Sequence, residues 1–308
     1  AQFDDERVHI NFRTDLETGR YRQGWSNYGR TLEVRDLGRI DRSGGRMQFT
    51  LRRAAGTFRF EGRGDSERAA GSFEFVSDAG FRGELGRLGF DDLTDSNLFV
   101  FALEDLTISG VRQLQAQVSD QIDTRDLVNM INHGAGPRHV QQLADLGFRG
   151  LRSSEYVRAR DHGVTANFAE GMRDAGFRLS LEQLIRSRDH GVSPEFAAAM
   201  RQLGHELSHE ELIRSRDHGV SAEFIREMNA LGQRLSHEQL IRARDHGVTT
   251  QFIRDLRELG YDRLPISDYI RLRDHGVTVS YVRRVKQLYA ETPSVERLIR
   301  LRAHGDIR

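Results

Sequence analysis

The pattern of apolar and polar positions changes its period along the chain. Over about the first 75 residues, apolar side chains alternate with polar ones, as half-buried antiparallel strands require. The alternating stretches are Val8–Phe12, Met47–Leu51, Phe58–Phe60 and Phe73–Phe75. The glycine-rich stretch Gly62–Asp65 separates the last two and predicts a hairpin. We therefore predict a small antiparallel β-sheet or sandwich over residues 1–78.

From residue 79 onward the apolar positions follow a helical period, and the sequence repeats itself. The segment Leu184–Ser193 returns almost unchanged as Leu212–Ser221 and as Leu240–Thr249. The glycines of the shared Arg-Asp-His-Gly signature are spaced by 28, 28, 28 and 29 residues, at Gly163, Gly191, Gly219, Gly247 and Gly276. About eight such repeats fill residues 79–308, and the first and last are irregular.

Each repeat contains the start and stop signals of two short helices. Ser208 and Glu211 form a capping box, and Gly219 supplies a left-handed stop for the first helix. Ser221 then caps a second helix that ends at Gly232. Helix pairs this short bury their apolar faces only by stacking on neighbouring pairs. The predicted fold class is α+β, with the β-sheet or sandwich followed by an α-solenoid of 28–29-residue two-helix repeats.

Two apolar columns run through the repeats and predict the solenoid core. They are Val157, Ile185, Ile213, Ile241 and Ile270 in the first helices, and Phe168, Phe196, Phe224, Phe252 and Tyr281 in the second. We interpret the aromatic column as core rather than as a ligand-binding stripe.

Composition restricts the possible functions. The 46 acidic and 46 basic residues cancel, which argues against a nucleic-acid partner. Lys286 is the single lysine, so the basic surface is made of arginine. The absence of cysteine excludes disulfides, thiolate metal sites and cysteine nucleophiles. No apolar run approaches the roughly 18 residues of a membrane span. The start at Ala1-Gln2-Phe3 resembles a processed chain, which favours an exported protein.

One stretch imitates a metalloprotease motif. His205, Glu206 and His209 have the spacing of HExxH, which needs one continuous helix to bring both histidines to zinc. Gly204 and Ser208 interrupt that helix, so we expect no zinc site there.

Histidines and arginines recur in every signature. The histidines are His133, His162, His190, His218, His246, His275 and His304. We interpret them as bonding the last carbonyls of their own helices, with a metal-binding row and a pH-responsive surface as alternatives. The arginines and adjacent aspartates predict an Arg/Asp ladder between repeats, or else an arginine row that faces a partner. Candidate binding residues are Arg186, Arg188, Arg214, Arg216, Arg242 and Arg244, together with Trp25 in a polar loop.

The strand pair ending in Gly71-Ser72-Phe73-Glu74-Phe75, followed by Leu88-Gly89-Phe90 and the Leu-Ile-Arg-x-Arg-Asp-His-Gly-Val repeats, resembles a known region. It is similar to the repeat-bearing C-terminal region of some bacterial sensor metallopeptidases of the M56 (BlaR1-type) family. The resemblance covers nearly the whole chain, but the zinc-bearing peptidase part has no counterpart here. What it implies is an accessory sensing or binding region without an activity of its own. Together with the processed start, it favours a secreted or periplasmic bacterial protein.

The sequence contains no nucleophile elbow, phosphate-binding loop or calcium loop. We therefore expect a non-enzymatic scaffold without a cofactor, whose Arg/Asp/His-lined surface binds a protein or a cell-envelope component. The alternative is a self-assembling filament in which the β domain of one copy docks on the last repeat of the next. Leu298, Ile299 and Leu301 would then form the contact, because the second helix of that repeat is missing.

Overall fold

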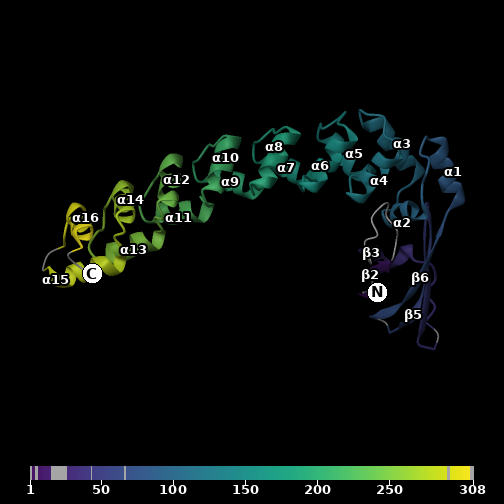
Figure 1. Ribbon diagram of the computed structural model, residues 1–308, viewed down its shortest axis with the longest axis horizontal. Helices are drawn as coiled ribbons and strands as arrows, with labels where there is room; N and C mark the ends of the chain where they lie inside the picture. Colours follow the sequence, from purple (N-terminus) through teal and green to yellow (C-terminus); the bar gives the residue numbers. More distant parts are fainter. Residues whose placement is uncertain are drawn as a thin grey trace. The chain divides into compact units, whose positions relative to one another are not determined.

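The computed structural model describes residues 2–3, 6–14, 26–42, 44–65, 67–289 and 292–305. In these ranges, strands are followed by helices in a repeated arrangement, which confirms the predicted α+β class (Figure 1). The change from strand to helix falls at Asp78. The chain divides into two compact units, Ala1–Ala166 and Asn167–Arg308, so the N-terminal unit contains the sheets together with the first repeats.

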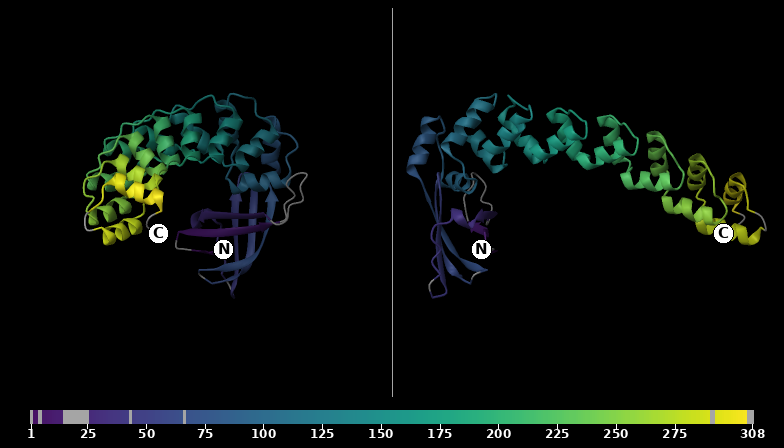
Figure 2. Two further views of the ribbon diagram at one scale, coloured as in Figure 1. Left: turned by 60° about the vertical axis from the view of Figure 1, so that its left-hand side comes forward. Right: turned by 180° about the vertical axis from the view of Figure 1, so that it is seen from behind.

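Two antiparallel three-stranded sheets form the sandwich of the N-terminal unit, and they confirm the predicted strands and hairpin. The first sheet has the order β1 (Gln2–Phe3), β2 (Arg7–Thr14) and β3 (Ser26–Glu33); the second has the order β4 (Arg46–Arg53), β5 (Gly56–Gly64) and β6 (Ala69–Ser77). The strands of one sheet run across those of the other (Figure 2).

A cluster of aromatic rings holds the two sheets together. Phe12 of the first sheet lies 5.5 Å from Phe58 and 5.3 Å from Phe73 of the second, measured between ring centroids. Helix α2 (Asp95–Leu103) adds Phe99, whose ring centroid is 5.3 Å from that of Phe58. Helix α2 therefore packs against β5 and β6 of the second sheet.

The remaining helices alternate between the first and second positions of the repeat. In the N-terminal unit they are α1 (Ala79–Arg87), α3 (Ile108–Gln117), α4 (Thr124–Asn132), α5 (Pro137–Asp145) and α6 (Ser153–Asp161). The following helices, which we call the C-terminal array, are α7 (Ala166–Asp174), α8 (Leu181–Asp189), α9 (Pro194–Gln202), α10 (His209–Asp217), α11 (Ala222–Ala230), α12 (His237–Asp245), α13 (Thr250–Glu258), α14 (Ile266–Asp274), α15 (Val279–Leu288) and α16 (Val295–His304). Within the described ranges, none of the helices combines the length and the apolar character needed to cross a membrane.

The predicted helix signals are confirmed in atomic detail. The backbone N–H of Glu211 donates to Ser208 Oγ over 3.3 Å, and the backbone N–H of Ser208 donates to Glu211 Oε2 over 2.8 Å. Gly219 ends α10 with a φ of +69°, a conformation that costs a residue with a Cβ about 1–2 kcal/mol. Ser221 caps α11 by accepting from the backbone N–H of Phe224.

Both predicted columns form the core. All ten side chains are at most 8% exposed. A further column links the second helices, because Gly171 lets Pro194 of the next repeat approach so closely that a Cβ at Gly171 would lie 2.8 Å from the proline Cγ. Packing between consecutive repeats therefore depends on matched pairs of residues.

Candidate functional site

In the C-terminal array, the arginine two residues before the signature histidine lies over the aromatic ring of the preceding repeat. The distances from the guanidinium carbon to the ring centroid are 5.0 Å for Arg188 over Phe168, 5.1 Å for Arg216 over Phe196, 5.1 Å for Arg244 over Phe224, 5.3 Å for Arg273 over Phe252 and 5.1 Å for Arg302 over Tyr281. Such cation–π contacts contribute about 0.5–2 kcal/mol each. Three of the six candidate arginines are thus engaged between repeats.

The signature glycine makes room for this stacking. A Cβ at Gly219 would lie 3.3 Å from Arg244 Nη2, and one at Gly247 would lie 3.2 Å from Arg273 Nη2. The recurrence of glycine therefore has two causes, the left-handed conformation and the neighbouring guanidinium. The link between the aromatic column and the signature arginine was not predicted, although the two residue types recur together along the sequence.

The first arginine of the signature forms ion pairs with the next repeat. Arg186 donates to both carboxylate oxygens of Glu210 over 2.5 and 2.8 Å, and Arg214 pairs with Glu238 in the same way over 2.6 and 2.9 Å. Hydrogen bonding to Arg186 lowers the pKa of Glu210, and the same bond raises the pKa of Arg186. We call this series of contacts the Arg–Glu ladder.

The Arg–Glu ladder is interrupted at Arg242. Glu210 and Glu238 are the second residues of α10 and α12, but Ser267 occupies that place in α14. Arg242 is exposed, and in the part of the chain that the structure describes its guanidinium has no ion-pair or hydrogen-bond partner. The ladder resumes with Arg271, which donates to Glu296 over 3.0 Å. Among the equivalent arginines at positions 186, 214, 242 and 271, Arg242 is the one without a carboxylate partner in the described structure.

The signature histidine and aspartate bond to each other across repeats, which corrects two predictions. The Nδ1–Oδ1 distances are 2.6 Å for His133 and Asp161, 2.7 Å for His190 and Asp217, 2.6 Å for His218 and Asp245, and 2.5 Å for His246 and Asp274. In these pairs the histidine side chain reaches the next repeat rather than the last carbonyls of its own helix. The aspartate bonds this histidine, so the predicted Arg/Asp ladder is a His–Asp ladder.

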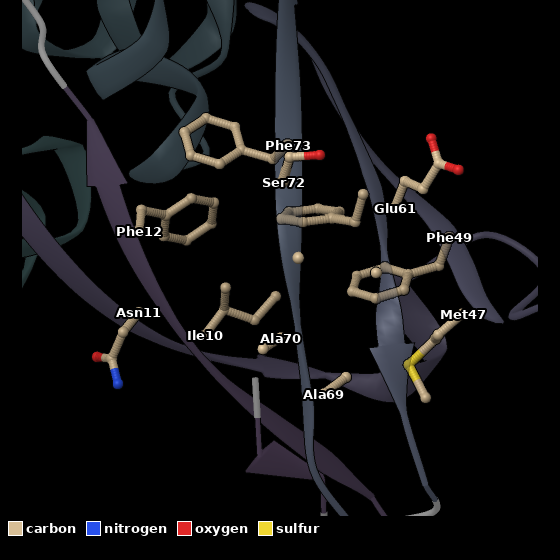
Figure 3. A pocket seen from close by; sticks show the side chains of 13 residues that line it. Ile10, Asn11, Phe12, Met47, Phe49, Glu61, Ala69, Ala70, Ser72 and Phe73 are labelled. Carbon is tan, nitrogen blue, oxygen red and sulfur yellow. The ribbon is translucent and has the colours of Figure 1, made fainter. Parts of the chain in front are cut away.

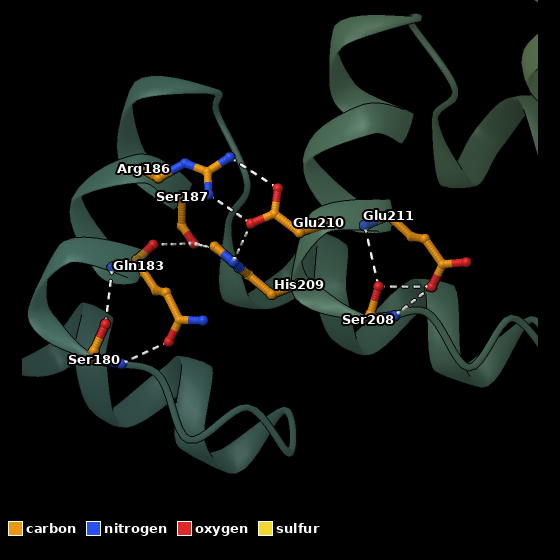
Figure 4. Close-up of polar contacts among 8 residues, drawn as sticks. All are labelled: Ser180, Gln183, Arg186, Ser187, Ser208, His209, Glu210 and Glu211. Carbon is orange, nitrogen blue, oxygen red and sulfur yellow. Dashed lines mark hydrogen bonds and ion pairs between the residues drawn. The ribbon is translucent and has the colours of Figure 1, made fainter.

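A buried histidine begins α10 and joins it to α8 (Figure 4). The Ser187 hydroxyl donates to the Gln183 carbonyl over 2.9 Å, so it accepts from His209 Nε2 over 2.8 Å. This places the proton on Nε2 and leaves Nδ1 buried without a hydrogen bond in the described structure. Burial lowers the pKa of His209, and Glu210 opposes the shift. His237 bonds Ser215 in the same way over 2.8 Å.

This arrangement settles the geometry of the HExxH stretch. His205 precedes α10 and His209 starts it, so the two do not share a continuous helix. His209 is committed to Ser187 of the previous repeat. Among the described residues, no group of three or more histidine, aspartate or glutamate side chains is placed to hold a metal ion.

His139 occupies the aromatic column in the N-terminal unit. It is the third residue of α5, as Phe168 is of α7, and it is 8% exposed. Burial lowers its pKa from 6.5 to about 4, and the charge of Arg160 acts in the same direction. The imidazole is therefore neutral at pH 7 and serves as a core side chain.

The sandwich contains a pocket of about 230 Å³ between its sheets. Ile10 and Phe12 point into it from β2, while Asn11 points away (Figure 3). Phe49 and Phe73 line it from β4 and β6. Its side chains are mostly apolar, and they belong to the aromatic cluster that joins the sheets. The sequence analysis did not identify this pocket.

The remaining predicted site residues are Trp25 and the three apolar residues of the last repeat. Leu298 is fully buried, so it does not form an exposed patch, and Ile299 and Leu301 are half-buried. Leu298 is the fourth residue of α16, and the equivalent fourth residue of α12, Leu240, is buried as well. Trp25 lies outside the described residues.

In comparisons with protein families, curated proteins and solved structures, the chain matches no family model, no curated protein and no solved structure. The resemblance to the sensor metallopeptidases therefore stays a prediction from the repeat motif alone.

Proposed function

We propose that the protein is a non-enzymatic scaffold that binds an acidic segment of a protein partner at Arg242. The observation that carries this proposal is the interruption of the Arg–Glu ladder. Equivalent arginines at positions 186 and 214 have carboxylate partners within the chain, whereas Arg242 faces solvent opposite Ser267. A carboxylate supplied by a partner would complete the ladder with the same bidentate geometry.

The contacts between repeats support a scaffold role. The His–Asp ladder, the stacked arginines and the Arg–Glu ladder each connect one repeat to the next. Together they connect neighbouring helices. Within the predicted arginine row, Arg242 is the position at which the carboxylate of the Arg–Glu ladder is missing, which supports an acidic segment of a protein as the partner.

The sharpest test adds the missing carboxylate to the chain itself. In Ser267→Glu, the new side chain is equivalent to Glu238 and should pair with Arg242, as Glu238 pairs with Arg214. The full chain would be immobilised, and captured proteins from its source cells would be quantified by mass spectrometry. We expect the partner captured by the wild type to fall about tenfold with Ser267→Glu and with Arg242→Gln, since bonds to charged groups contribute about 1.5–3 kcal/mol.

Arg214→Gln is the matched control. It removes an arginine at the equivalent position of the previous repeat but leaves Arg242 unchanged, so capture should stay at the wild-type level. Ser267→Glu should also keep or slightly raise the thermal midpoint, because an exposed ion pair contributes about 0–1 kcal/mol. Capture of no specific protein would contradict the scaffold proposal, and equal capture by all four proteins would contradict the role of Arg242.

The head-to-tail alternative requires exposed apolar side chains on α16. With Leu298 buried, only the half-buried Ile299 and Leu301 remain of the three predicted contact residues.

A further inference from the structure

Two neighbouring junctions of the C-terminal array contain a serine–histidine pair. At these junctions, the seventh residue of one first helix meets the first residue of the next. Ser187 of α8 bonds His209 of α10, and Ser215 of α10 bonds His237 of α12, both with an Oγ–Nε2 distance of 2.8 Å. A titratable group therefore lies inside two successive contacts between repeats.

The next two junctions have apolar residues in the same places. Ala243 and Ile266 take these positions between α12 and α14, and Leu272 and Val295 take them between α14 and α16. All four side chains are at most 7% exposed. Stacking of the first helices therefore does not require histidine at this position, and the later junctions provide a reference that cannot titrate there.

The imidazoles of the two pairs have no partner for a second proton. His209 is 7% exposed, and its Nε2–H already donates to Ser187, whose hydroxyl donates to the Gln183 carbonyl. A further proton would bind Nδ1, which is buried and has no hydrogen-bond partner in the described structure; the same is true of Nδ1 of His237. A buried imidazolium without an acceptor is costly, and the cost is relieved when water reaches the ring.

The charged neighbours of His209 do not remove this cost. Oε1 of Glu210 lies 3.7 Å from Nδ1 of His209, but the two oxygens of this carboxylate accept from Arg186 (Figure 4). Arg186 and His190 both act against a positive charge on the ring. A protonated His209 would therefore compete with Arg186 for one carboxylate.

The surroundings of His237 are comparable. The charged or titratable groups that act on it are Glu211, Glu238, Arg214 and His205. Glu238 is bound by Arg214, and Glu211 is bound by the helix cap Ser208, so both carboxylates already have partners. A proton on His205 opposes one on His237 because the two rings repel each other when charged.

We propose that the α8–α10 and α10–α12 junctions form an acid-sensitive segment of the array. As the pH falls below neutrality, proton uptake at His209 and His237 separates α10 from its two neighbours, while α12, α14 and α16 remain stacked. Arg242 faces α14, in the part that stays stacked, so this inference is independent of the binding proposed there.

The direction of the pH dependence follows from burial. Burial lowers the pKa of both histidines from 6.5 in the folded chain, whereas the opened chain binds these protons near pH 6.5. The junctions are therefore fully stable above pH 6.5 and lose stability as the pH falls toward the lowered values. Hydrogen bonds lower the pKa of Glu210, Glu211 and Glu238, so these carboxylates stay charged while the histidines titrate.

Hydrogen exchange of the full chain at pH 7.5 and pH 5.0 tests the proposal, with rates corrected for the intrinsic effect of pH. We expect protection of α10 to fall about tenfold more than protection of α14, because an unsatisfied buried group destabilises its surroundings on this scale. Helix α14 is a matched reference, since its junction with α12 keeps the exposed pair of His246 and Asp274. An equal fall in α10 and α14 would overturn the proposal.

Two variants exchange the junction types. Ser187→Ala, His209→Ile, Ser215→Ala and His237→Ile together copy the pair of Ala243 and Ile266, and should remove the difference between α10 and α14. A combined variant that folds at pH 7.5 and keeps the difference would contradict the role of the two histidines.

The reverse variant, Ala243→Ser with Ile266→His, should transfer the acid-dependent loss of protection to α14. It decides the question if the combined variant does not fold. Protection of α14 that stays as insensitive to acid as in the wild type would then overturn the proposal.

Discussion

The C-terminal array and the N-terminal sandwich are held together by different kinds of contact. In the array, stacked arginines, His–Asp pairs and Arg–Glu pairs join neighbouring repeats, except that Ser267 replaces the glutamate opposite Arg242. In the sandwich, the two sheets are joined by a cluster of aromatic rings. Residues that recur in every repeat are therefore explained by contacts between repeats. Binding is better sought where the sequence departs from repetition, as at Ser267.

The largest expected effect shows how far the loss of one buried ring destabilises its surroundings in each of the two regions. Phe224→Ala and Phe58→Ala each remove a buried ring and should cost about 3–5 kcal/mol of unfolding free energy. Because array repeats contact only their neighbours, Phe224→Ala should lower hydrogen-exchange protection mainly in α10–α13. Phe58→Ala should lower it throughout β2, β4, β5 and β6, whose rings contact Phe58 or one another.

The more conservative Phe224→Leu is the control for the stacked arginine. It keeps an apolar side chain in the core but removes the ring beneath Arg244, so the loss should be about 1–2 kcal/mol. Loss of protection in the sandwich on substitution of Phe224 would show that the two regions do not differ in this way.

A smaller effect depends on pH and concerns His139. The unfolded chain takes up a proton at this histidine near pH 6.5, whereas the folded chain does so only near its lowered pKa of about 4. Stability present above pH 6.5 is therefore lost as the pH falls from 6.5 through about 4, by about 3 kcal/mol once the folded chain is also protonated. His139→Phe, which restores the residue type of the column, should abolish that part of the loss.

Urea unfolding of both proteins at pH 7.5 and 4.5 measures the difference. The other histidines and the carboxylates are the same in the two chains, so their titration cancels in the comparison. An equal loss of stability in the wild type and in His139→Phe would show that the buried imidazole does not contribute.

The smallest effect tests whether the buried serine–histidine pairs stabilise the array. Ala243 and Ile266 occupy, two junctions later, the positions of Ser187 and His209. Ser187→Ala alone leaves the His209 Nε2–H without an acceptor and should cost about 1–3 kcal/mol. The double variant Ser187→Ala with His209→Ile should lie within about 1 kcal/mol of the wild type, as measured in a double-mutant cycle. A double variant as unstable as the sum of the single variants would contradict this.

Much of the fold could be predicted because its signals are local. Capping residues such as Ser208, the stop at Gly219 and the alternation of Phe58 and Phe60 act within a few positions of the chain. The buried columns followed from periodicity alone. The same reasoning identified the arginines as a recurring set but not their partners.

The partners could not be predicted because they lie one repeat away, where spacing does not say which side chains meet. Aspartate stands beside arginine in the sequence, yet Asp217 bonds His190, 27 positions earlier. Arginine instead faces the phenylalanine of the previous repeat. The sequence signal of these contacts is that both partners change together from one junction to another. Ser187 and His209 at one junction correspond to Ala243 and Ile266 at a later one.

Two consecutive junctions of the array, α8–α10 and α10–α12, are interchangeable. The contact between α8 and α10 uses Arg186 with Glu210, Ser187 with His209 and His190 with Asp217, and that between α10 and α12 uses the same pairs of residue types. Excision or duplication of one whole repeat therefore joins surfaces that already fit. The number of repeats in the array can therefore change by recombination within the gene, without a new interface having to evolve.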